Sequence, residues 1–183
     1  MKTYTISGLR TITCYGSSIV FASHMYDMEG VYGVATYIND HRAKIWYDAE
    51  YADTIGIREW IFSPAQIPIQ DLPDNVSQVA YYSLIVDNFL DPLDGDLLAE
   101  ILAADMDIYG LTTEFACPVK VSVYYSIDSN LSPDKLKRMV EQKDVKGNSK
   151  DDKAKTKLNF KVREIESEPK ILSRAEYLQK MGI

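Results

Sequence analysis

The first third of the chain mixes β-branched and aromatic residues with single glycines, a pattern that predicts a series of short strands. We expect strands over residues 2–6, 9–14 and 18–23, and a further short one over 57–62. A hairpin is expected from residues 31–38 and 43–47, because the Asn39-Asp40 pair between these β-prone runs is typical of a turn.

Apolar residues three and four positions apart predict helices further along the chain. A helix is expected over 74–90, with Asp74 as its N-cap, and Asp91-Pro92 would end it. A second helix is expected from Asp94 or Asp96 to about residue 108, with Gly110 suited to its C-terminal end.

The second helix has an apolar face and an acidic face. Apolar residues at helical spacing fall on one side, namely Leu97, Leu98, Ile101, Leu102 and Ile108. Asp96, Glu100 and Asp107 fall on the opposite side. Asp105 lies within the apolar side, where a carboxylate is costly without a partner. Either Asp105 is paired or the helix ends early, and we favour an early, frayed end.

The last third predicts two strands and two helices. Residues 119–128 alternate apolar and polar side chains, which predicts a strand with one solvent-facing side, and 158–163 repeats the pattern. Ser132-Pro133 would open a helix, and the capping box from Ser173 to Glu176 would open another that ends near Gly182. This order predicts one α+β domain over 1–183, with a mainly antiparallel sheet and helices on one face.

Composition narrows the class of protein without naming a function. The chain has 183 residues, a formal charge of −7, two cysteines and 46% hydrophobic residues, which is ordinary for a globular protein. Two cysteines, Cys14 and Cys117, are too few for a disulfide scaffold. No apolar run is long enough for a transmembrane helix, and polar residues interrupt any signal-peptide core. We therefore expect a cytoplasmic protein that does not enter membranes.

Charge is divided unevenly along the chain. Residues 1–128 carry 6 basic and 18 acidic side chains, whereas residues 129–183 carry 14 basic and 9 acidic ones. Between Arg58 and Lys120 there is no Lys, Arg or His, but there are eleven carboxylates. Such a division predicts either a charged partner or the docking of the two parts on each other. A solvated acidic face together with a mobile basic loop is the alternative.

No catalytic or cofactor motif is present in the sequence. His24 and His41 have no nearby cysteine, so no zinc spacing exists, and the phosphate-loop, dinucleotide and nucleophile-elbow patterns are missing. A calcium loop that starts at Asp94 fails, because Leu98 would occupy a ligand position. We expect no catalytic residue, no metal site and no cofactor.

Basic residues offer three places where a phosphate could bind. The first is the hairpin tip with His41, Arg42 and Lys44, and the second is Lys120 on the expected strand. The third is a mobile basic loop insertion expected over 144–157, and its flanks and interior supply Lys143, Lys146, Lys150, Lys153, Lys155 and Lys157. Lysine-rich mobile segments bind nucleic acid through counterion release. A solubilising loop is the alternative.

Several collinear segments resemble a known family. They are Thr5-Ile6-Ser7-Gly8, the Met28–Gly33 run followed by His41-Arg42-Ala43, the Ala104–Gly110 run, and Pro118-Val119-Lys120-Val121-Ser122. In order and rough spacing these segments resemble the DevR-type RAMP backbone subunit of type I CRISPR Cascade. The segment Gln78 to Phe89 takes the place of a helix of that family.

The resemblance implies a modified RRM or ferredoxin-like palm that binds RNA and is not itself a nuclease. It implies guide RNA and other protein subunits as partners, with self-assembly along the RNA. His41, Arg42, Lys44 and Lys120 would then contact RNA, and the basic loop would be a finger or thumb insertion. The chain is shorter than the usual member, and its acidic body has the wrong sign for a polyanion.

An acidic inhibitor is the alternative function. Carboxylates of the segment between Glu59 and Glu114 would meet a basic, nucleic-acid-binding surface on a partner protein. The residues expected to do so are Asp91, Asp94, Asp96, Glu100 and Asp107.

Overall fold

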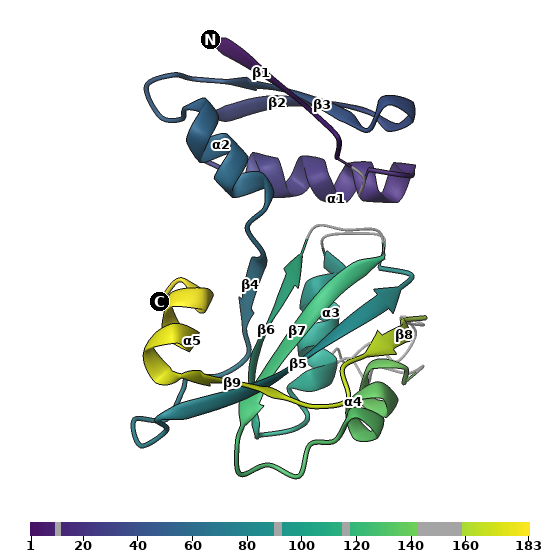
Figure 1. Cartoon of the computed structure of the whole chain (residues 1–183), viewed down its shortest axis with the longest axis vertical. Coiled ribbons are helices and arrows are strands. Elements are labelled where there is room, and N and C mark those ends of the chain that lie inside the picture. The colour runs from purple at the N-terminus through teal and green to yellow at the C-terminus, as the bar shows by residue number, and fades with distance from the viewer. Residues whose placement is uncertain (10–11, 90–92, 115–117, 143–158) are drawn as a thin grey trace, which may run out of the picture.

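The computed structural model describes the chain in five stretches, residues 1–9, 12–89, 93–114, 118–142 and 159–183. Within them the backbone forms a three-stranded and a six-stranded sheet together with helices α1 to α5 (Figure 1). The strand pairings of both sheets are antiparallel. The fold is therefore α+β with antiparallel sheets, which confirms the predicted class.

The three-stranded sheet has the order β1-β3-β2, with strands β1 (Lys2–Ser7), β2 (Val31–Tyr37) and β3 (Arg42–Tyr47). A short 3-10 turn, η1 (Ile38–Asp40), joins β2 to β3, so the predicted hairpin is confirmed. Helices α1 (Tyr15–Tyr26) and α2 (Thr54–Ile61) pack on one face. The apolar residues of both helices form one hydrophobic core with that face. The core includes Phe21 of α1, Ile57 of α2 and Ile45 of β3.

Helix α1 occupies residues 18–23, where the sequence predicted a strand, and the described residues of 9–14, namely 9 and 12–14, form no strand either, so both predictions are wrong there. Cys14 is the N-cap, and its Sγ accepts a hydrogen bond from the Ser17 amide at 3.4 Å. Ser17, Phe21 and Met25 are buried at a spacing of four, which is the period of a helix and not of a strand. Tertiary burial thus outweighs the β propensity of this segment.

Helix α2 likewise replaces the strand predicted over 57–62. The Asp53 side chain caps it by accepting a hydrogen bond from the Gly56 amide at 2.7 Å. Ile57 and Ile61 are buried one turn apart, so the apolar pattern that indicated a short strand is one face of a short helix.

The six-stranded sheet has the order β4-β6-β7-β5-β8, and β9 also pairs with β5. Its strands are β4 (Ala65–Pro68), β5 (Gln78–Asp87), β6 (Ile108–Glu114), β7 (Val119–Ser126), β8 (Lys161–Ile165) and β9 (Lys170–Ser173). Strand β5 lies between β7 on one side and the successive short strands β8 and β9 on the other.

Strand β5 contradicts the helix predicted over 74–90, and with it the helix that the family resemblance placed at Gln78 to Phe89. Val79, Tyr82 and Val86 suggested a helical stripe, but all three are buried because β5 is covered on both faces. A central strand loses the alternation of apolar and polar residues that marks an edge or half-exposed strand.

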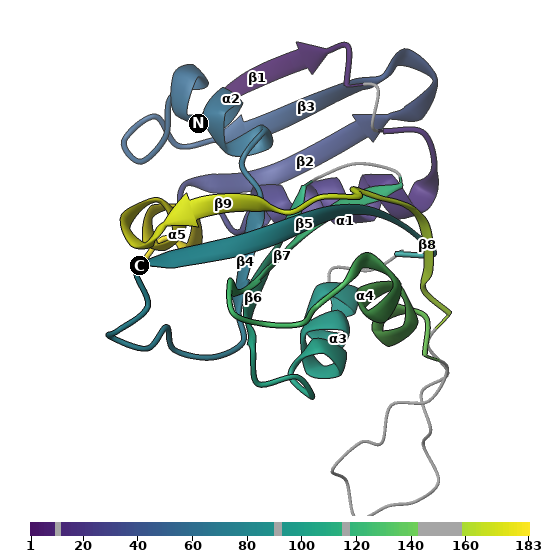
Figure 2. The same ribbon diagram turned by 60° about the horizontal axis from the view of Figure 1, so that its bottom comes forward.

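Helices α3 (Leu93–Leu102) and α4 (Pro133–Val140) cover one face of the six-stranded sheet, as predicted (Figure 2). Helix α5 (Arg174–Met181) packs against one end of the opposite face, where Tyr177 contacts Tyr124 at a ring distance of 5.5 Å. The predicted solvent-facing side of β7 is therefore wrong in part. Ser122 and Tyr124 on that side are buried.

The predicted caps of the last two helices are confirmed. Ser132 caps α4 by accepting from the Lys135 amide at 3.2 Å, and Pro133 takes the first position. Ser173 and Glu176 form the predicted capping box of α5, which ends at Gly182 in a left-handed conformation. Helix α3 ends at Leu102, earlier than residue 108, and Gly110 lies inside β6.

Each sheet has a hydrophobic core of its own among the described residues. The expectation of one domain over 1–183 stays a prediction, because two cores can still unfold together. The loop insertion expected over 144–157 lies outside the described residues.

Candidate nucleic-acid interface

The outer face of the three-stranded sheet is the face that α1 and α2 leave uncovered. Alternate residues of β3 point to it, because Ala43, Ile45 and Tyr47 are buried in the core below. The outward residues of β3 are Arg42, Lys44 and Trp46. The strand register places Tyr37, Ala35 and Gly33 of β2 on one side of them, and Ser7, Thr5 and Thr3 of β1 on the other.

Arg42 is stacked on an aromatic ring of the neighbouring strand. Its guanidinium lies 4.2 Å from the centre of the Tyr37 ring, directly across the β2–β3 ladder. A contact with Asp40 at 3.4 Å is long, and both side chains are exposed. The Arg42 Nε is buried and has no hydrogen-bond partner among the described residues, so it does not face solvent. A donor for an external acceptor must therefore come from the exposed terminal part of the guanidinium.

Lys44 and Trp46 form a second cation–aromatic pair on the same strand. The Lys44 ammonium lies 5.0 Å from the centre of the Trp46 ring. Trp46 packs directly over Gly33, since a Cβ at that position would come within 3.2 Å of the indole. The absence of a side chain at Gly33 thus fixes the half-buried indole against the sheet beside a cation.

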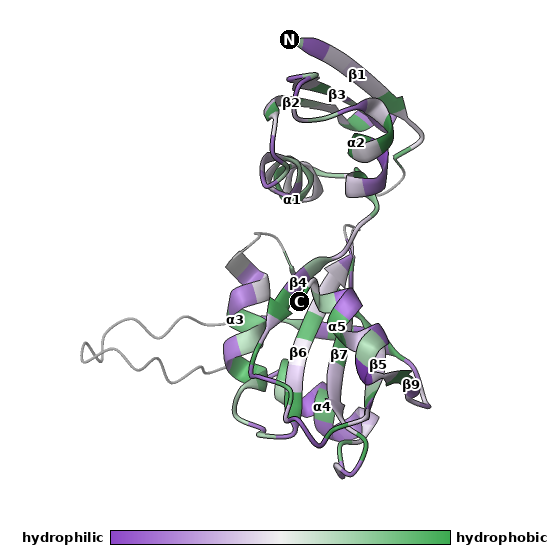
Figure 3. Cartoon of the chain, turned by 90° about the vertical axis from the view of Figure 1, so that its left-hand side faces the viewer, coloured by the Kyte–Doolittle hydropathy of each residue, from purple (hydrophilic) through white to green (hydrophobic). Residues whose placement is uncertain are grey.

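This outer face lies at one end of the molecule. In Figures 1 and 3, helices α1 and α2 lie between the three-stranded sheet and the six-stranded sheet, so the outer face points away from the rest of the chain. A flat, exposed sheet with two cations and two aromatic rings can stack unpaired bases and contact phosphates.

His41 is on the hairpin tip, but its contacts are structural. It adopts a left-handed backbone conformation with φ of 47°, and its Nδ1 lies 3.0 Å from the carbonyl oxygen of Ile12. Its own carbonyl oxygen accepts a hydrogen bond from the Leu9 amide at 2.8 Å. His41 therefore fastens the β1–α1 connection to the hairpin tip.

Lys120 is not brought together with Arg42 and Lys44. It lies on β7 of the six-stranded sheet and forms an ion pair with Glu114 at 3.5 Å. Its register partner on β5 is Ile85. The predicted site thus divides between two sheets.

The remaining predicted cations lie outside the described residues. They are Lys143, Lys146, Lys150, Lys153, Lys155 and Lys157. Their role in binding stays a prediction.

The predicted acidic surface is present in part. Asp96 and Glu100 are exposed one turn apart on α3, and Asp107 is exposed just before β6. Asp94 is half-buried in the first turn of α3, and Asp91 lies outside the described residues. The buried residues Leu98, Ile101 and Leu102 confirm that the acidic stripe faces away from the sheet.

The uneven charge of the chain is partly neutralised by internal ion pairs. Three of them join the acidic part to the basic part, namely Asp74–Arg174 at 3.8 Å, Asp87–Arg163 at 2.7 Å and Asp105–Lys135 at 2.6 Å. The two parts therefore contact each other through these pairs, which was one of the explanations that the charge pattern left open.

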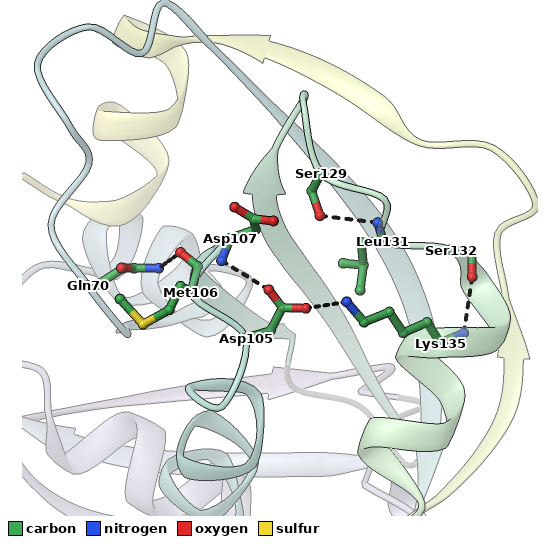
Figure 4. A network of polar contacts seen from close by, with 8 residues as sticks. All are labelled: Gln70, Asp105, Met106, Asp107, Ser129, Leu131, Ser132 and Lys135. Atoms are coloured by element: carbon green, nitrogen blue, oxygen red, sulfur yellow. Dashed lines mark hydrogen bonds and ion pairs between the residues drawn. The ribbon is translucent and has the colours of Figure 1, made fainter.

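Asp105 is paired as well as placed beyond the helix (Figure 4). Lys135 of α4 donates to its Oδ2 at 2.6 Å, and its Oδ1 accepts from the Asp107 amide at 3.0 Å. The Lys135 hydrogen bond, ahead of the backbone one, lowers the pKa of the Asp105 carboxyl below its usual value. Both alternatives hold, because α3 ends early, at Leu102, and Asp105 beyond it is paired with Lys135.

A cavity of about 410 Å³ lies where α1 and α2 meet the start of β4. His24 and Trp60 are stacked in its wall and exchange hydrogen bonds, with His24 Nε2 at 2.6 Å from the Trp60 carbonyl oxygen and Trp60 Nε1 donating to the His24 carbonyl at 2.7 Å. Burial lowers the pKa of His24, although the hydrogen bond to Trp60 opposes this shift.

Within the five described stretches, no group of three or more His, Cys, Asp or Glu side chains is placed to hold a metal ion. In the same part of the chain, no helix has the length and apolar character needed to cross a membrane.

The chain matches no protein-family model, no curated protein and no solved structure in the comparisons made.

The sequence interpretation missed the aromatic half of this surface. Tyr37 and Trp46 were not among the predicted contacts, although Arg42 and Lys44 were. Part of the signal was present, since Lys44 and Trp46 alternate along the predicted strand over 43–47 and must share a face. Arg42 was placed at the hairpin tip, whereas β3 begins at this residue. The position of Tyr37 beside Arg42 depends on the register of the hairpin, and the register cannot be assigned until the length of the turn is known.

Proposed function

We propose that the chain is a non-catalytic RNA-binding subunit, and that single-stranded RNA binds on the outer face of the three-stranded sheet. The observation that carries the proposal is the pair of cation–aromatic contacts, Arg42 on Tyr37 and Lys44 on Trp46, side by side on one exposed face.

The physical argument combines charge with stacking. Arginine and lysine neutralise phosphates and release counterions, whereas a tyrosine or tryptophan ring stacks on any base. Arg42, Lys44 and Trp46 are spaced about 6.8 Å apart along β3, given a rise of about 3.4 Å per residue. A platform of this length has room for the two or three bases that sheet-based RNA-binding modules stack.

The finer proposal is a backbone-type subunit of a CRISPR ribonucleoprotein, with guide RNA and other subunits as partners. It rests on the collinear segments described above and not on any match to a known protein. Two of these segments, Thr5–Gly8 and His41–Ala43, contribute residues to β1 and β3 of the proposed surface.

A charge-reversal series tests the RNA site. The double variant Arg42→Glu/Lys44→Glu should bind a fluorescein-labelled single-stranded RNA at least tenfold more weakly, measured by fluorescence anisotropy. Because each lost phosphate contact removes about 0.7 from the slope of log affinity against log salt, two lost contacts should lower that slope by about 1.4.

Lys2→Glu/Arg58→Glu is the matched control, since it makes the same change of charge at exposed residues of the same layer, away from the outer face. It should retain most of the affinity and the slope. An equal loss of RNA affinity in both double variants would show that only net charge matters, and would contradict an RNA site on the outer face.

The acidic inhibitor is the second candidate, favoured by the exposed stripe of Asp96, Glu100 and Asp107. The two functions differ at the first purification step. An RNA-binding subunit should co-purify with nucleic acid and show a raised ratio of absorbance at 260 to 280 nm. An inhibitor should be free of nucleic acid and bind a basic protein, and the triple Lys variant of the stripe should abolish that binding.

A further inference from the structure

A second, smaller cavity lies on the face of the six-stranded sheet that α3 and α4 leave uncovered. It has a volume of about 170 Å³ and lies beside Pro64, which leads into β4. One water molecule needs only about 10–15 Å³ of such space, so a multi-atom ligand fits. The cavity has a hydroxyl floor and a charged rim.

The floor is a row of buried hydroxyl groups across three neighbouring strands. The register aligns Ser83 of β5 with Ser122 of β7, and Ser122 with Thr112 of β6. These three residues are only 4–7% exposed, a degree of burial that is uncommon for serine and threonine.

The hydroxyls bond to one another in two pairs. Ser83 Oγ lies 3.1 Å from Ser122 Oγ, and Thr112 Oγ1 lies 3.2 Å from the Tyr124 hydroxyl oxygen. Each hydroxyl carries one proton and each of these bonds uses one, so the row retains O–H donors for another acceptor. Burial raises the pKa of Tyr124, which keeps its hydroxyl protonated.

The rim gathers three lysines from three elements, Lys120 of β7, Lys170 of β9 and Lys180 of α5. Glu114, which also lines the cavity, lies 3.5 Å from Lys120, and Glu166 lies 3.1 Å from Lys170, so the lining has three lysines against one carboxylate. Lys180 forms no ion pair with any residue that the structure describes. Lys120 comes from the acidic part of the chain, residues 1–128, whereas Lys170 and Lys180 come from the basic part, so the fold brings lysines from both parts to one rim.

We propose that this cavity binds a phosphate group, either as inorganic phosphate or as the terminal phosphate of a nucleotide or nucleic acid. A tetrahedral dianion can accept hydrogen bonds from the hydroxyl floor and from the lysines of the rim at once. The three ammonium groups repel a metal cation, and a hydroxyl floor disfavours an apolar ligand. The site is independent of the proposed RNA surface, which lies on the other sheet.

Isothermal titration of the full chain with inorganic phosphate tests the proposal, with amide chemical shifts from NMR to locate the site. Phosphate should bind saturably and shift the amides of Ser83, Thr112 and Ser122. Lys180→Gln should weaken binding roughly tenfold, since it removes a charged hydrogen bond. The exposed Lys137→Gln on α4 should leave the affinity unchanged.

The double variant Ser83→Ala/Ser122→Ala tests the floor without leaving one hydroxyl of the pair unsatisfied. It should weaken phosphate binding several-fold and keep the far-UV circular dichroism of the parent. Absence of saturable phosphate binding, or equal affinity in Lys180→Gln and Lys137→Gln, would overturn the proposal.

Two RNA oligonucleotides identify the source of the phosphate, one with a 5′-phosphate and one with a 5′-hydroxyl. Tighter binding of the first by the Arg42→Glu/Lys44→Glu protein, in which the proposed RNA surface is removed, would assign the cavity to a nucleic-acid terminus. Equal binding of both, with saturable inorganic phosphate, would assign it to the free anion. Neither result depends on the proposed RNA surface, because both are measured in the protein that lacks Arg42 and Lys44.

Discussion

Cations lie in different settings on two sheet faces of this molecule, the outer face of the three-stranded sheet and the face of the six-stranded sheet opposite α3 and α4. On the three-stranded sheet, Arg42 and Lys44 lie over aromatic rings on an exposed plane. On the six-stranded sheet, Lys120 and Lys170 lie beside carboxylates around a polar cavity. The first setting suits a strand of bases that slides across a surface, and the second suits one compact anion. Residue type alone therefore does not define a phosphate site, because neighbours decide what a lysine can bind.

The largest effect is expected from breaking the core beneath the first face. Phe21→Ala removes a fully buried ring of α1 and should lower the free energy of unfolding by about 3–5 kcal/mol. Both tryptophans of the chain, Trp46 and Trp60, lie in this layer. Tryptophan fluorescence therefore reports the unfolding of the three-stranded sheet with α1 and α2, whereas far-UV circular dichroism reports the unfolding of the whole chain.

The same measurement decides whether the two layers form one cooperative unit. If the chain is a single domain, both probes should give one denaturant midpoint in the parent and in Phe21→Ala. A fluorescence midpoint that moves alone would divide the chain into two units near residue 63.

A smaller effect should separate stacking from charge on the first face. Trp46→Ala should weaken single-stranded RNA binding by roughly 1–3 kcal/mol while the salt dependence stays unchanged, since no cation is lost. Anisotropy at several salt concentrations checks both. A reduced salt slope without a loss of stacking energy would contradict the assignment of Trp46 as a base platform.

The ion pair behind the second face should contribute about 1–2 kcal/mol, because a hydrogen bond to a charged group is stronger than a neutral one. The pKa of folded Asp105 lies below its unfolded value of about 3.8. Its contribution is therefore fully present above that value and is lost as the pH falls through the folded pKa. Asp105→Asn should remove this part of the acid sensitivity, as measured by urea unfolding between pH 5 and about 2.5.

The smallest effect on stability is expected from His24, which lines the cavity where α1 and α2 meet the start of β4. Because burial lowers its folded pKa, the unfolded chain binds protons more readily. Stability should fall as the pH drops below the unfolded pKa of about 6.5, down to the folded pKa. The measurement is the melting temperature of the parent and of His24→Gln between pH 7.5 and about 5. The parent should lose stability over this range more steeply than the variant, and an equally flat dependence on pH in both would disprove the role of His24.

Local signals predicted much of the fold, and burial explains what they missed. The caps at Ser132 and Ser173 and the hairpin around η1 depend on neighbouring residues, so the sequence contains them. Residues 18–23 and 78–87 were assigned to the wrong type of structure. The first is β-prone yet buries every fourth residue, and the second is buried on both faces and shows no alternation.

The candidate site was predictable only in part for a related reason. The alternation of Arg42 and Lys44 along one strand is a local property. Whether Lys120 joins them depends on how many sheets the chain forms, and the partner of Asp105 is thirty positions away at Lys135. Contacts of that range follow from tertiary packing, which no pattern in one segment specifies.

One contact outside both faces has a practical consequence. The carboxylate of Glu141, at the end of α4, accepts a hydrogen bond from the amide of Val162 on β8 at 2.9 Å. This hydrogen bond joins the end of α4 to β8 across 21 positions of sequence. The packing of α4 on the sheet and the pairing of β8 with β5 are therefore coupled through one side chain, and a substitution of Glu141 is expected to weaken the contact between the two elements.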